Sequence, residues 1–598
     1  MNKYALQVRA YPSGRDSLGV IVRCARGDLK SVAAYYGDRY APIGAPDLQL
    51  DRRIRLQLAG ADDLYHYWTG ELETATQRIG YYFLLDDGNE QCLYGEGGFS
   101  PAPPLPLWCW CFEYPYLWWS EENEPPAWAK EAVIYQIFPE RFANGDPGND
   151  PRHCRPWGER PTRESFFGGD LQGIRDHLDY LAELGVNCLY LTPIFRSGSN
   201  HKYDTADYLK IDPAFGNKRT ARVLVEACHA RGIRVILDAV FNHCGYDFRP
   251  FRDVRRRGPA SPYHEWFNLR GYPVEAGPAC NYETFANGVW QMPKLRTDRA
   301  EVREYLVGVA EQWTRELKID GWRLDVGADA DPGFWREFRH RIRAVNPEAL
   351  IIGEVWHDAS AFLQGDQMDA IMNYTWQYLC VDFFARRAMD VRSFVEVMNR
   401  QRMWYRESVT SACWNLLDSH DRMRFLTACG RDKSSLKLAT VFQFTALGVP
   451  YIYYGAEIGM EGGEDPDCRR CMPWREEEWD RDLLVHYKGL VHLRRDNRVF
   501  SHGRQVDLIA DPKTGLYAFV RASGSEYALV CLNTGERHAP LLPALLRSAA
   551  AEWGIDGFLD RPGRMAFSTA PDHGPDKANA WMEETMIPPR SAVVWVGI

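Results

Sequence analysis

The stretch Ile319-Asp-Gly-Trp-Arg-Leu-Asp-Val-Gly327, followed by Ala349-Leu-Ile-Ile-Gly-Glu-Val-Trp356, decides the fold of this chain. Both are near-continuous apolar runs whose ionisable residues gather toward the C-terminal end. Runs of this kind are typical of strands that are buried on both faces of a parallel sheet. Asp325 and Glu354 are separated by about 30 residues, the length of one βαβ unit, so we expect the two acids on neighbouring strand ends.

Six further apolar runs alternate with helical patterns along the chain. They are VIYQIF at 133–138, NCLYLTPIF at 187–195, RVILDAVFN at 234–242, MDAIMNY at 368–374, SACWNLLD at 411–418 and VPYIYYG at 449–455. Between them, segment 171–185 places its apolar residues on one helical face, and segment 220–232 ends on a glycine suited to a helix C-terminus. Eight strand–helix units predict an α/β fold, a (β/α)8 TIM barrel, which carries its chemistry at strand C-termini.

The rest of the chain has a different pattern. Residues 1–125 contain short strand patterns with turn signals and predict an N-terminal β-sandwich. The barrel is expected over 126–497, and residues 498–598 return to short strands that predict a C-terminal β-sandwich. Because the third and fourth barrel strands are far apart in the sequence, we expect a small inserted domain at about 244–298.

Composition narrows the class of protein. A net charge of −10 over 598 residues argues against nucleic acid as a partner, because nucleic-acid affinity depends on Lys and Arg. No apolar run is long enough to span a membrane, and the N-terminal residues do not resemble a signal peptide. The 15 cysteines, an odd number without a disulfide-like spacing, favour a cytoplasmic location.

Ionisable residues follow four of the predicted strands. They form the groups Asp238-Ala-Val-Phe-Asn-His243, Arg323-Leu-Asp325, Glu354-Val-Trp356 and Asp418-Ser-His-Asp421. A single acid at such a place is as readily a helix N-cap or a loop carboxylate, but four groups that meet at one barrel mouth favour catalysis. Arg323 lies on the same strand face as Asp325, and we expect its charge to hold Asp325 as a carboxylate. A glycosidase needs one ionised and one protonated carboxyl group.

These groups resemble the four signature regions of glycoside hydrolase family 13, the α-amylase family. The resemblance implies that Asp325 is the nucleophile, that Glu354 is the general acid and then the base, and that Asp421 stabilises the transition state by gripping sugar hydroxyls. It also implies a set of sugar-binding residues, namely Tyr203, His243, Arg323, His420, Asp465 and Arg469. Within this set, Tyr203 would stack beneath the sugar and the two histidines would hydrogen-bond it.

More narrowly, the chain resembles the neopullulanase, cyclomaltodextrinase and maltogenic amylase group. The N-terminal module, the inserted domain and the segment Met292-Pro-Lys-Leu295 carry this likeness. Two positions depart from the group, since Arg296 stands in place of Asn and Val326-Gly-Ala-Asp329 replaces Val-Ala-Asn-Glu. In the group the N-terminal module of one subunit covers the barrel mouth of another, which implies a homodimer. The alternative for the aromatic segment Tyr65-His-Tyr-Trp68 is the module's own core.

A loop near the start of the barrel is a candidate metal site. The segment 144–150 contains four side chains with oxygen atoms, from Asn144, Asp146, Asn149 and Asp150, and such oxygens are the ligands that Ca²⁺ prefers. The alternative is a hydrogen-bonded Asx loop. The resemblance implies a structural calcium site that Gly168 and Asp170 complete. No organic cofactor is expected.

The function that follows is hydrolysis of α-1,4-glucosidic bonds in cyclodextrins and short maltodextrins, with some transfer to other sugars. A glucanotransferase or an α-glucosidase is an alternative with the same chemistry. An alternative of another class is a catalytically silent carbohydrate-binding protein, because a fold alone does not guarantee activity. The presence of all three carboxylates and of Arg323 speaks against a silent protein.

Overall fold

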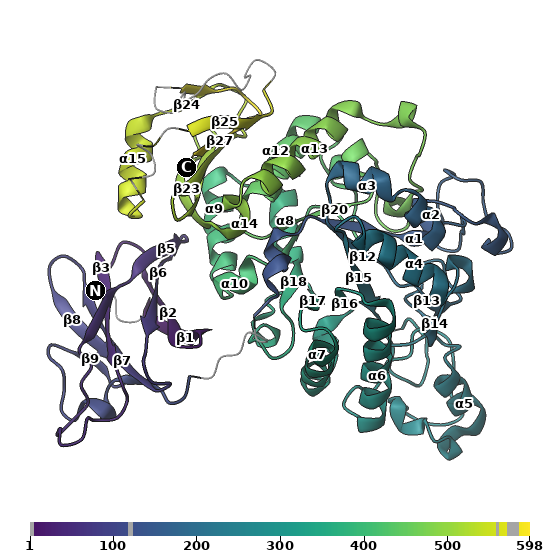
Figure 1. The fold of residues 1–598 in the computed structure, drawn as a ribbon, viewed down its shortest axis with the longest axis horizontal. Helices are drawn as coiled ribbons and strands as arrows, with labels where there is room; N and C mark the ends of the chain where they lie inside the picture. The colour runs from purple at the N-terminus through teal and green to yellow at the C-terminus, as the bar shows by residue number, and fades with distance from the viewer. Residues whose placement is uncertain are drawn as a thin grey trace.

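A barrel lies between two β-rich parts that come from the two ends of the chain (Figure 1). The computed structural model describes residues 5–117, 124–286, 288–555, 557, 561, 563–570 and 585–597. In Figure 1 the N-terminal part lies at the left, the C-terminal part lies above it, and the barrel fills the right of the view. The predicted fold class, a TIM barrel with terminal β domains, is confirmed.

Eight parallel strands close the barrel in the order in which they follow along the chain. They are β11 (Ile134–Ile137), β12 (Cys188–Leu191), β15 (Arg234–Ala239), β16 (Gly321–Leu324), β17 (Leu350–Val355), β18 (Ala370–Asn373), β19 (Trp414–Leu416) and β20 (Val449–Tyr453). The barrel closes because β11 also pairs with β20, with Ile134 opposite Tyr451. Each of the eight apolar runs contributes one strand, so the strand C-termini carry the acidic groups to one end of the barrel.

Amphipathic helices cover the outside of the barrel. The longer ones are α4 (Lys218–His229), α6 (Ala300–Leu317), α7 (Pro332–Val345), α9 (Val391–Arg402), α12 (Lys433–Thr445) and α13 (Arg481–Asp496). Shorter ones are α1 (Pro139–Phe142), α8 (Tyr374–Cys380), α10 (Glu407–Thr410), α11 (Phe425–Ala428) and α14 (Val499–His502). Side-chain caps fix several starts, as where Asn217 accepts hydrogen bonds from the backbone of Arg219 and Thr220 before α4.

The segment 171–185 forms two helices instead of the single helix that its periodicity predicts. These are α2 (Leu171–Asp176) and α3 (Leu178–Leu184), separated at His177, where φ is −109° and ψ is 15°. The imidazole of His177 lies 3.7 Å from the ring of Trp474, centroid to centroid, and its Nδ1 lies 2.8 Å from Gly173 O. The backbone conformation at His177 is therefore set by a tertiary contact. The periodicity of the local sequence gives no sign of this contact.

Two excursions rise from the C-terminal end of the barrel. One is a hairpin of β13 (Phe195–Ser197) and β14 (Thr205–Ile211) that follows β12. The other runs between β15 and α6, contains α5 (Arg249–Arg257), and returns to the barrel where His243 pairs with Lys294. Both excursions contribute residues to the cavity described below.

The N-terminal module consists of two packed sheets. One contains β1 (Gln7–Gly14), β2 (Ser17–Ala25), β6 (Tyr65–Glu73) and β5 (Gln57–Ala61) in that order. The other contains β4 (Arg52–Arg55), β3 (Ser31–Gly37), β7 (Ile79–Asp86), β8 (Gln91–Gly95) and β9 (Gly98–Ser100), with β10 (Phe112–Tyr114) on β7. Tyr67 and Trp68 are buried, and the Tyr67 hydroxyl donates to Asp62. Trp68 therefore belongs to the module's own core, whereas Tyr67 bonds an aspartate that also contacts Arg400 of α9.

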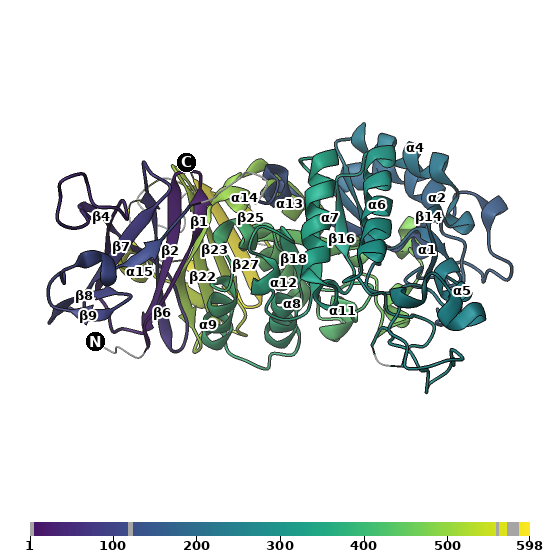
Figure 2. The ribbon, with the colours of Figure 1, turned by 90° about the horizontal axis from the view of Figure 1, so that it is seen from below.

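The module rests on helix α9 of its own chain (Figures 1 and 2). Asn399 donates a hydrogen bond to Ala61 O at 3.0 Å, and Arg400 Nε lies 3.3 Å from Asp62 Oδ2. This contact lies on the side of the barrel, and no residue before Arg141 lines the cavity in the described part of the chain.

The C-terminal part is a five-stranded antiparallel sheet with a small second sheet. The strand order in the larger sheet is β21 (Arg504–Asp511), β22 (Leu516–Ser523), β23 (Glu526–Asn533), β27 (Ser591–Gly597) and β25 (Gly563–Ser568). In the small sheet, β24 (Ala539–Leu541) pairs with β26 (Thr585–Ile587). Helix α15 (Pro543–Glu552) follows β24 and precedes β25 in the sequence. The buried Arg521 joins this sheet to the barrel, because it donates to Thr445 O at the end of α12. No helix in the described residues has both the length and the apolar character to cross a bilayer.

Candidate active site

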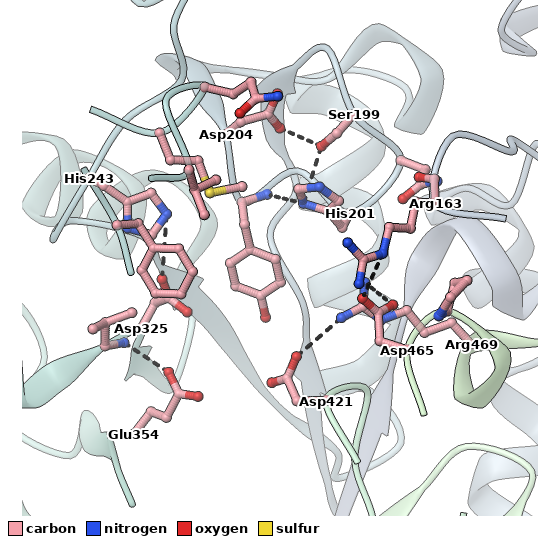
Figure 3. Close-up of a pocket in the computed structure, with 18 of the residues that line it drawn as sticks. Arg163, Ser199, His201, Asp204, His243, Asp325, Glu354, Asp421, Asp465 and Arg469 are labelled. Atoms are coloured by element: carbon pink, nitrogen blue, oxygen red, sulfur yellow. Dashed lines mark hydrogen bonds and ion pairs between the residues drawn. The ribbon is translucent and has the colours of Figure 1, made fainter. Parts of the chain in front are cut away.

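A cavity of about 790 Å³ opens at the C-terminal ends of the barrel strands. Seven residues singled out in the sequence line it, namely Tyr203, His243, Asp325, Glu354, Asp421, Asp465 and Arg469. Figure 3 shows that their side chains converge from different strand ends and loops. The two remaining candidates, Arg323 and His420, are buried directly beside this group.

Arg323 is the buried centre of the site. Its Nη1 donates to Asp325 Oδ1 at 2.7 Å and to Asp238 Oδ1 at 3.0 Å, and its Nη2 lies 2.9 Å from Glu354 Oε2. One guanidinium therefore holds three carboxyl groups from three neighbouring strands. These contacts fix the carboxyl groups in position, because the N–H groups of the buried Arg323 guanidinium have few alternative hydrogen-bond partners.

Burial raises the pKa of Asp325 well above its usual range. The positive charge of Arg323 opposes this rise, whereas the nearby Glu354 and Asp238 add to it. The sequence-based expectation included only the contribution of Arg323. Because one cation is shared among three buried carboxyl groups, the site favours a bound proton more strongly than the pair Arg323–Asp325 alone would.

Two neighbours fix the carboxyl group of Glu354. Its Oε2 accepts a hydrogen bond from Val326 N at 2.8 Å, and its Oε1 accepts one from Trp356 Nε1 at 2.9 Å.

Val326 has a φ of 47°, which a β-branched residue rarely adopts. The next residue, Gly327, has little room for a side chain, because a Cβ there would lie 2.9 Å from Met368 Cε. Within the departure at 326–329, this contact bears on Gly327 alone.

The other departure lies outside the cavity. The Nη1 of Arg296 lies 3.1 Å from Glu265, and its Nη2 lies 2.9 Å from Asp298. From the departure at 326–329, by contrast, Val326, Ala328 and Asp329 line the cavity, and Asp329 Oδ2 lies 3.9 Å from Lys294 Nζ.

A row of charges extends from Asp421 toward the rim of the cavity. Arg469 Nη2 lies 3.1 Å from Asp421 Oδ1, and Arg469 Nη1 lies 3.0 Å from Asp465 Oδ1. On its other side, Asp421 Oδ2 lies 3.1 Å from His420 Nε2. The carboxylate of Asp421 is therefore held between a guanidinium and an imidazole while it remains partly exposed to the cavity.

Tyr203 and His420 form a stacked pair at the floor of the site. Their rings are 5.4 Å apart and nearly parallel, and the Tyr203 hydroxyl lies 2.6 Å from His420 Nε2. The same hydroxyl donates to Asp238 Oδ2 at 2.9 Å. Burial lowers the pKa of His420 well below its usual range, so its imidazole is neutral near pH 7. A flat tyrosine face fixed in this way is suited to packing against a sugar ring.

His243 is available to a ligand. Burial lowers its pKa to about 3, so the ring is neutral, and its Nε2 lies 4.0 Å from Asp325 Oδ2. Neither of these two atoms has a hydrogen-bond partner among the described residues. Buried polar atoms without partners are rare, and here both belong to residues that line the cavity.

Some residues of the site were not chosen from the sequence. Asp238 was noted at a strand end but was not assigned a role, although it contacts Arg323, Tyr190 and Tyr203. Trp356 and His201, next to chosen residues, also line the cavity. Two further lining residues, Phe285 and Arg163, come from loops and had no signal in the sequence.

The predicted metal loop is folded around Asp170. Its carboxylate accepts hydrogen bonds from Gly145 N at 3.1 Å, Asp146 N at 2.9 Å and Asn149 Nδ2 at 3.0 Å. Asn144 donates to Asp150 at 2.8 Å. The described residues contain no cluster of three or more His, Cys, Asp or Glu side chains that could hold a metal. These contacts are those of a hydrogen-bonded loop.

The arrangement at the cavity supports one type of chemistry. Two carboxyl groups, Asp325 and Glu354, share a cation at the floor of a cavity that also presents a tyrosine face and a partly exposed third carboxylate. Such a set can displace a leaving group at a sugar carbon in two steps, through a covalent intermediate on one of the two carboxylates.

Comparison with known proteins agrees with this chemistry. Residues 136–503 match the family model described as the catalytic domain of α-amylase, and residues 6–118 match that of the α-amylase N-terminal ig-like domain. The chain is 46% identical over 528 residues to a cyclomaltodextrinase of Thermoanaerobacter pseudethanolicus, covering 88% of this chain and 91% of that protein. It is 49% identical over 537 residues to neopullulanase 2 of Thermoactinomyces vulgaris, covering 89% and 90%.

A solved structure described as a cyclomaltodextrinase is also similar. It superposes with a TM-score of 0.88 at 38% identity and covers 100% of both chains. The family models cover more than half of the chain, and the barrel fold agrees with them. The chain therefore belongs to the α-amylase family, glycoside hydrolase family 13, and is a glycoside hydrolase.

Proposed function

We propose that this enzyme hydrolyses α-1,4-glucosidic bonds in cyclodextrins and short maltodextrins with retention of configuration. The observation that carries the proposal is the contact of one guanidinium, that of Arg323, with both Asp325 and Glu354. This contact directs both carboxyl groups to the same part of the cavity. The similarity to proteins named cyclomaltodextrinase and neopullulanase supports the choice of substrates.

In the first step Asp325 acts as the nucleophile in its carboxylate form, which the charge of Arg323 favours. Its Oδ1 is held by Arg323, and Oδ2 is left to attack the anomeric carbon of a glucose unit. The bond between that carbon and the glycosidic oxygen breaks, and Glu354 gives its proton to the departing oxygen. Asp421, partly exposed between Arg469 and His420, stabilises the positive charge that develops on the sugar ring.

In the second step water completes the hydrolysis. Glu354, now a carboxylate, takes a proton from water, whose oxygen forms the new bond to the anomeric carbon as the bond to Asp325 breaks. Two displacements at one carbon restore the α configuration. Where a sugar hydroxyl replaces the water, the same step transfers the glucosyl unit, so we expect some transglycosylation at high sugar concentration.

Initial rates on β-cyclodextrin, pullulan and starch test this proposal. We expect β-cyclodextrin to be cleaved fastest. A faster rate on starch would contradict the proposed substrate class, and absence of cleavage of all three would contradict hydrolysis altogether. The ratio of longer to shorter products at high maltose concentration separates hydrolysis from transfer, because a glucanotransferase would form mainly products longer than the substrate, whereas the proposed hydrolase would form mainly shorter ones.

We further propose a structural Ca²⁺ ion in the loop at 144–150. Asn149 Oδ1 is buried without a hydrogen-bond partner among the described residues, and an unsatisfied buried oxygen suits a hard cation. Gly168 has a φ of 85°, and a Cβ there would lie 2.6 Å from Asn144 Nδ2 and closer still to Asp150. Small rearrangements of these oxygen-bearing side chains, together with Asp170, would allow them to hold the ion, which would tie the loop to the start of α2.

We also propose a homodimer in the cytoplasm. The N-terminal module contacts the side of its own barrel and leaves the cavity open, so this module is free to cover the cavity of a second copy. No disulfide joins any two of the 15 cysteines, which all lie in the described residues, and most of them are buried, which suits a reducing compartment. A two-fold arrangement of this kind would narrow the entrance to the cavity in both subunits.

A further inference from the structure

The cavity has a defined direction along which a glucan chain would lie. Glu354 donates a proton to the leaving group, so the leaving part of the substrate lies on the side of Glu354 and Trp356. The part that stays bound to Asp325 extends the opposite way, past Asp421 toward Arg469 and Asp465. Figure 3 shows Glu354 on one side of the cavity and Asp465 with Arg163 on the other.

The far end of this second half is bounded by a single loop. Thr162, Arg163 and Glu164 line the cavity there. Arg163 Nε lies 4.0 Å from Asp465 Oδ2, so the row of charges that begins at Asp421 and Arg469 ends at this arginine. The side chain of Arg163 is 76% exposed, which places it at the rim.

Hydrogen bonds from buried side chains hold the backbone around Arg163 in place. The buried Asn200 donates to Arg163 O at 2.8 Å and to Ser165 O at 2.9 Å, and the buried Arg141 also donates to Ser165 O, at 3.0 Å. Thr162 N donates to the hydroxyl of Ser165 at 2.8 Å. The loop is therefore fixed, and only the side chain of Arg163 is free to move aside.

We propose that Arg163 is a specificity-determining residue that limits the retained part of the substrate to two glucose units. The inference rests on the proposed function. The first unit, at the cleaved bond, is the one that Asp421 and Tyr203 contact. The second lies against Arg469 and Asp465. A third unit meets the side chain of Arg163, paired with Asp465, and must displace it. Maltose is then the favoured product from the non-reducing side of the cut.

Arg160 provides a matched control in the same loop. Its Nε lies 3.0 Å from Asp467 Oδ1, its side chain is 79% exposed, and it does not line the cavity. It therefore shares with Arg163 the charge, the exposure and an acidic partner from the segment 465–467. It differs from Arg163 in its position relative to the cavity and in a shorter contact with its acidic partner.

The test uses nitrophenyl α-maltoside and nitrophenyl α-maltotrioside. Release of nitrophenol requires two or three glucose units, respectively, to occupy the retained side. We expect the wild type to cleave the maltoside with the higher kcat/KM. Exposed ion pairs are weak, so Arg163→Ala should raise the ratio of maltotrioside to maltoside kcat/KM by about threefold to fivefold. Arg160→Ala should leave this ratio unchanged.

The outcomes separate this inference from the proposed function. If both glycosides are cleaved and the ratio stays the same in Arg163→Ala, Arg163 does not limit the retained chain. An equal rise in Arg160→Ala would assign the effect to surface charge and would also overturn the inference. If the wild type cleaves β-cyclodextrin but releases nitrophenol from neither glycoside, the inference alone fails. If it cleaves none of β-cyclodextrin, pullulan and starch, the proposed function fails and the inference fails with it. A melting temperature for each variant shows that the fold is intact.

Discussion

Arg323 holds one oxygen of Asp325 and leaves the other without a partner. Nη1 donates to Oδ1 at 2.7 Å, whereas Oδ2 has no hydrogen-bond partner among the described residues. The carboxyl group is thus fixed in rotation by a buried cation, and its second oxygen belongs to the lining of the cavity. In the proposed role of nucleophile, a carboxyl group held in this way would need no reorganisation before it attacks, and preorganisation of this kind accounts for much of enzymatic rate enhancement.

Asp325→Asn should abolish turnover while the protein remains folded. The substitution removes the nucleophile but hardly changes the volume of the side chain. We expect kcat on β-cyclodextrin to fall to less than about one hundredth of the wild-type value, because loss of a covalent nucleophile costs several orders of magnitude. A melting temperature close to that of the wild type serves as the control. Activity above that level would remove Asp325 from this role.

Glu354→Gln should affect substrates according to their leaving group. A nitrophenolate departs without help from a proton, whereas a glucose oxygen does not. We therefore expect the variant to lose far more kcat/KM on maltotriose than on a nitrophenyl maltoside. Glu348→Gln, an exposed position ahead of the same strand, is the matched control and should change neither value. Equal losses on both substrates would show that Glu354 is not the acid.

The barrel could be predicted from the sequence because each of its strands is marked by a local sequence pattern. Each barrel strand is an apolar run, and each acid lies at or just after the C-terminal end of its strand, so the strand order alone brings Asp238, Asp325 and Glu354 to one end. Periodicity was not sufficient at His177, where packing against Trp474 divides one predicted helix into two.

Parts of the site depend on distances that no sequence pattern contains. Arg163 and Phe285 lie on loops and reach the cavity only through the way those loops fold. The direction of the pKa shift of Asp325 was also missed, because it depends on burial and on the distance from Arg323 to two further carboxyl groups. An attraction between two residues can be inferred from their spacing on a strand, but the desolvation that outweighs it cannot.

The activity should decline on the acid side at a higher pH than for exposed aspartates. Burial raises the pKa of Asp238 to about 6 and raises that of Asp325 as well. A carboxyl group is charged only above its pKa, so Asp238 loses its charge as the pH falls through about 6, and Asp325 loses its charge at a higher pH than an exposed aspartate does. We expect the acid limb of kcat/KM on a nitrophenyl maltoside to lie well above the ordinary pKa of aspartate, about 3.9.

The variant Asp238→Asn tests the cause of this limb. It removes one titrating group and one negative charge beside Asp325, so the pKa of Asp325 should fall and the acid limb should move to lower pH. A wild-type profile that stays flat down to about pH 3.9, the ordinary pKa of aspartate, would contradict the prediction.

Removal of calcium should destabilise the protein without acting on the chemistry directly. An ion that binds only the folded state stabilises it by mass action, by about 2.7 kcal/mol at a concentration one hundred times the Kd. EDTA should therefore lower the melting temperature, and Asn149→Ala, which removes a side-chain oxygen of the loop, should reduce the size of that decrease. If EDTA leaves the melting temperature unchanged and the purified protein contains no metal, the loop is held by hydrogen bonds alone.

The ratio of cyclodextrin to starch activity should depend on protein concentration. If the N-terminal module of one copy narrows the cavity entrance of another, the dimer admits a small ring more readily than a long polymer, and the monomer has no such barrier. Dilution below the dimer Kd should then raise starch activity per molecule relative to β-cyclodextrin, and light scattering over the same concentrations should show the dimer dissociating. Two results would contradict the proposal, namely a monomer at every concentration or a ratio that does not change while the dimer dissociates. Neither would affect the assignment of Asp325 and Glu354, because both residues and Arg323 belong to one chain.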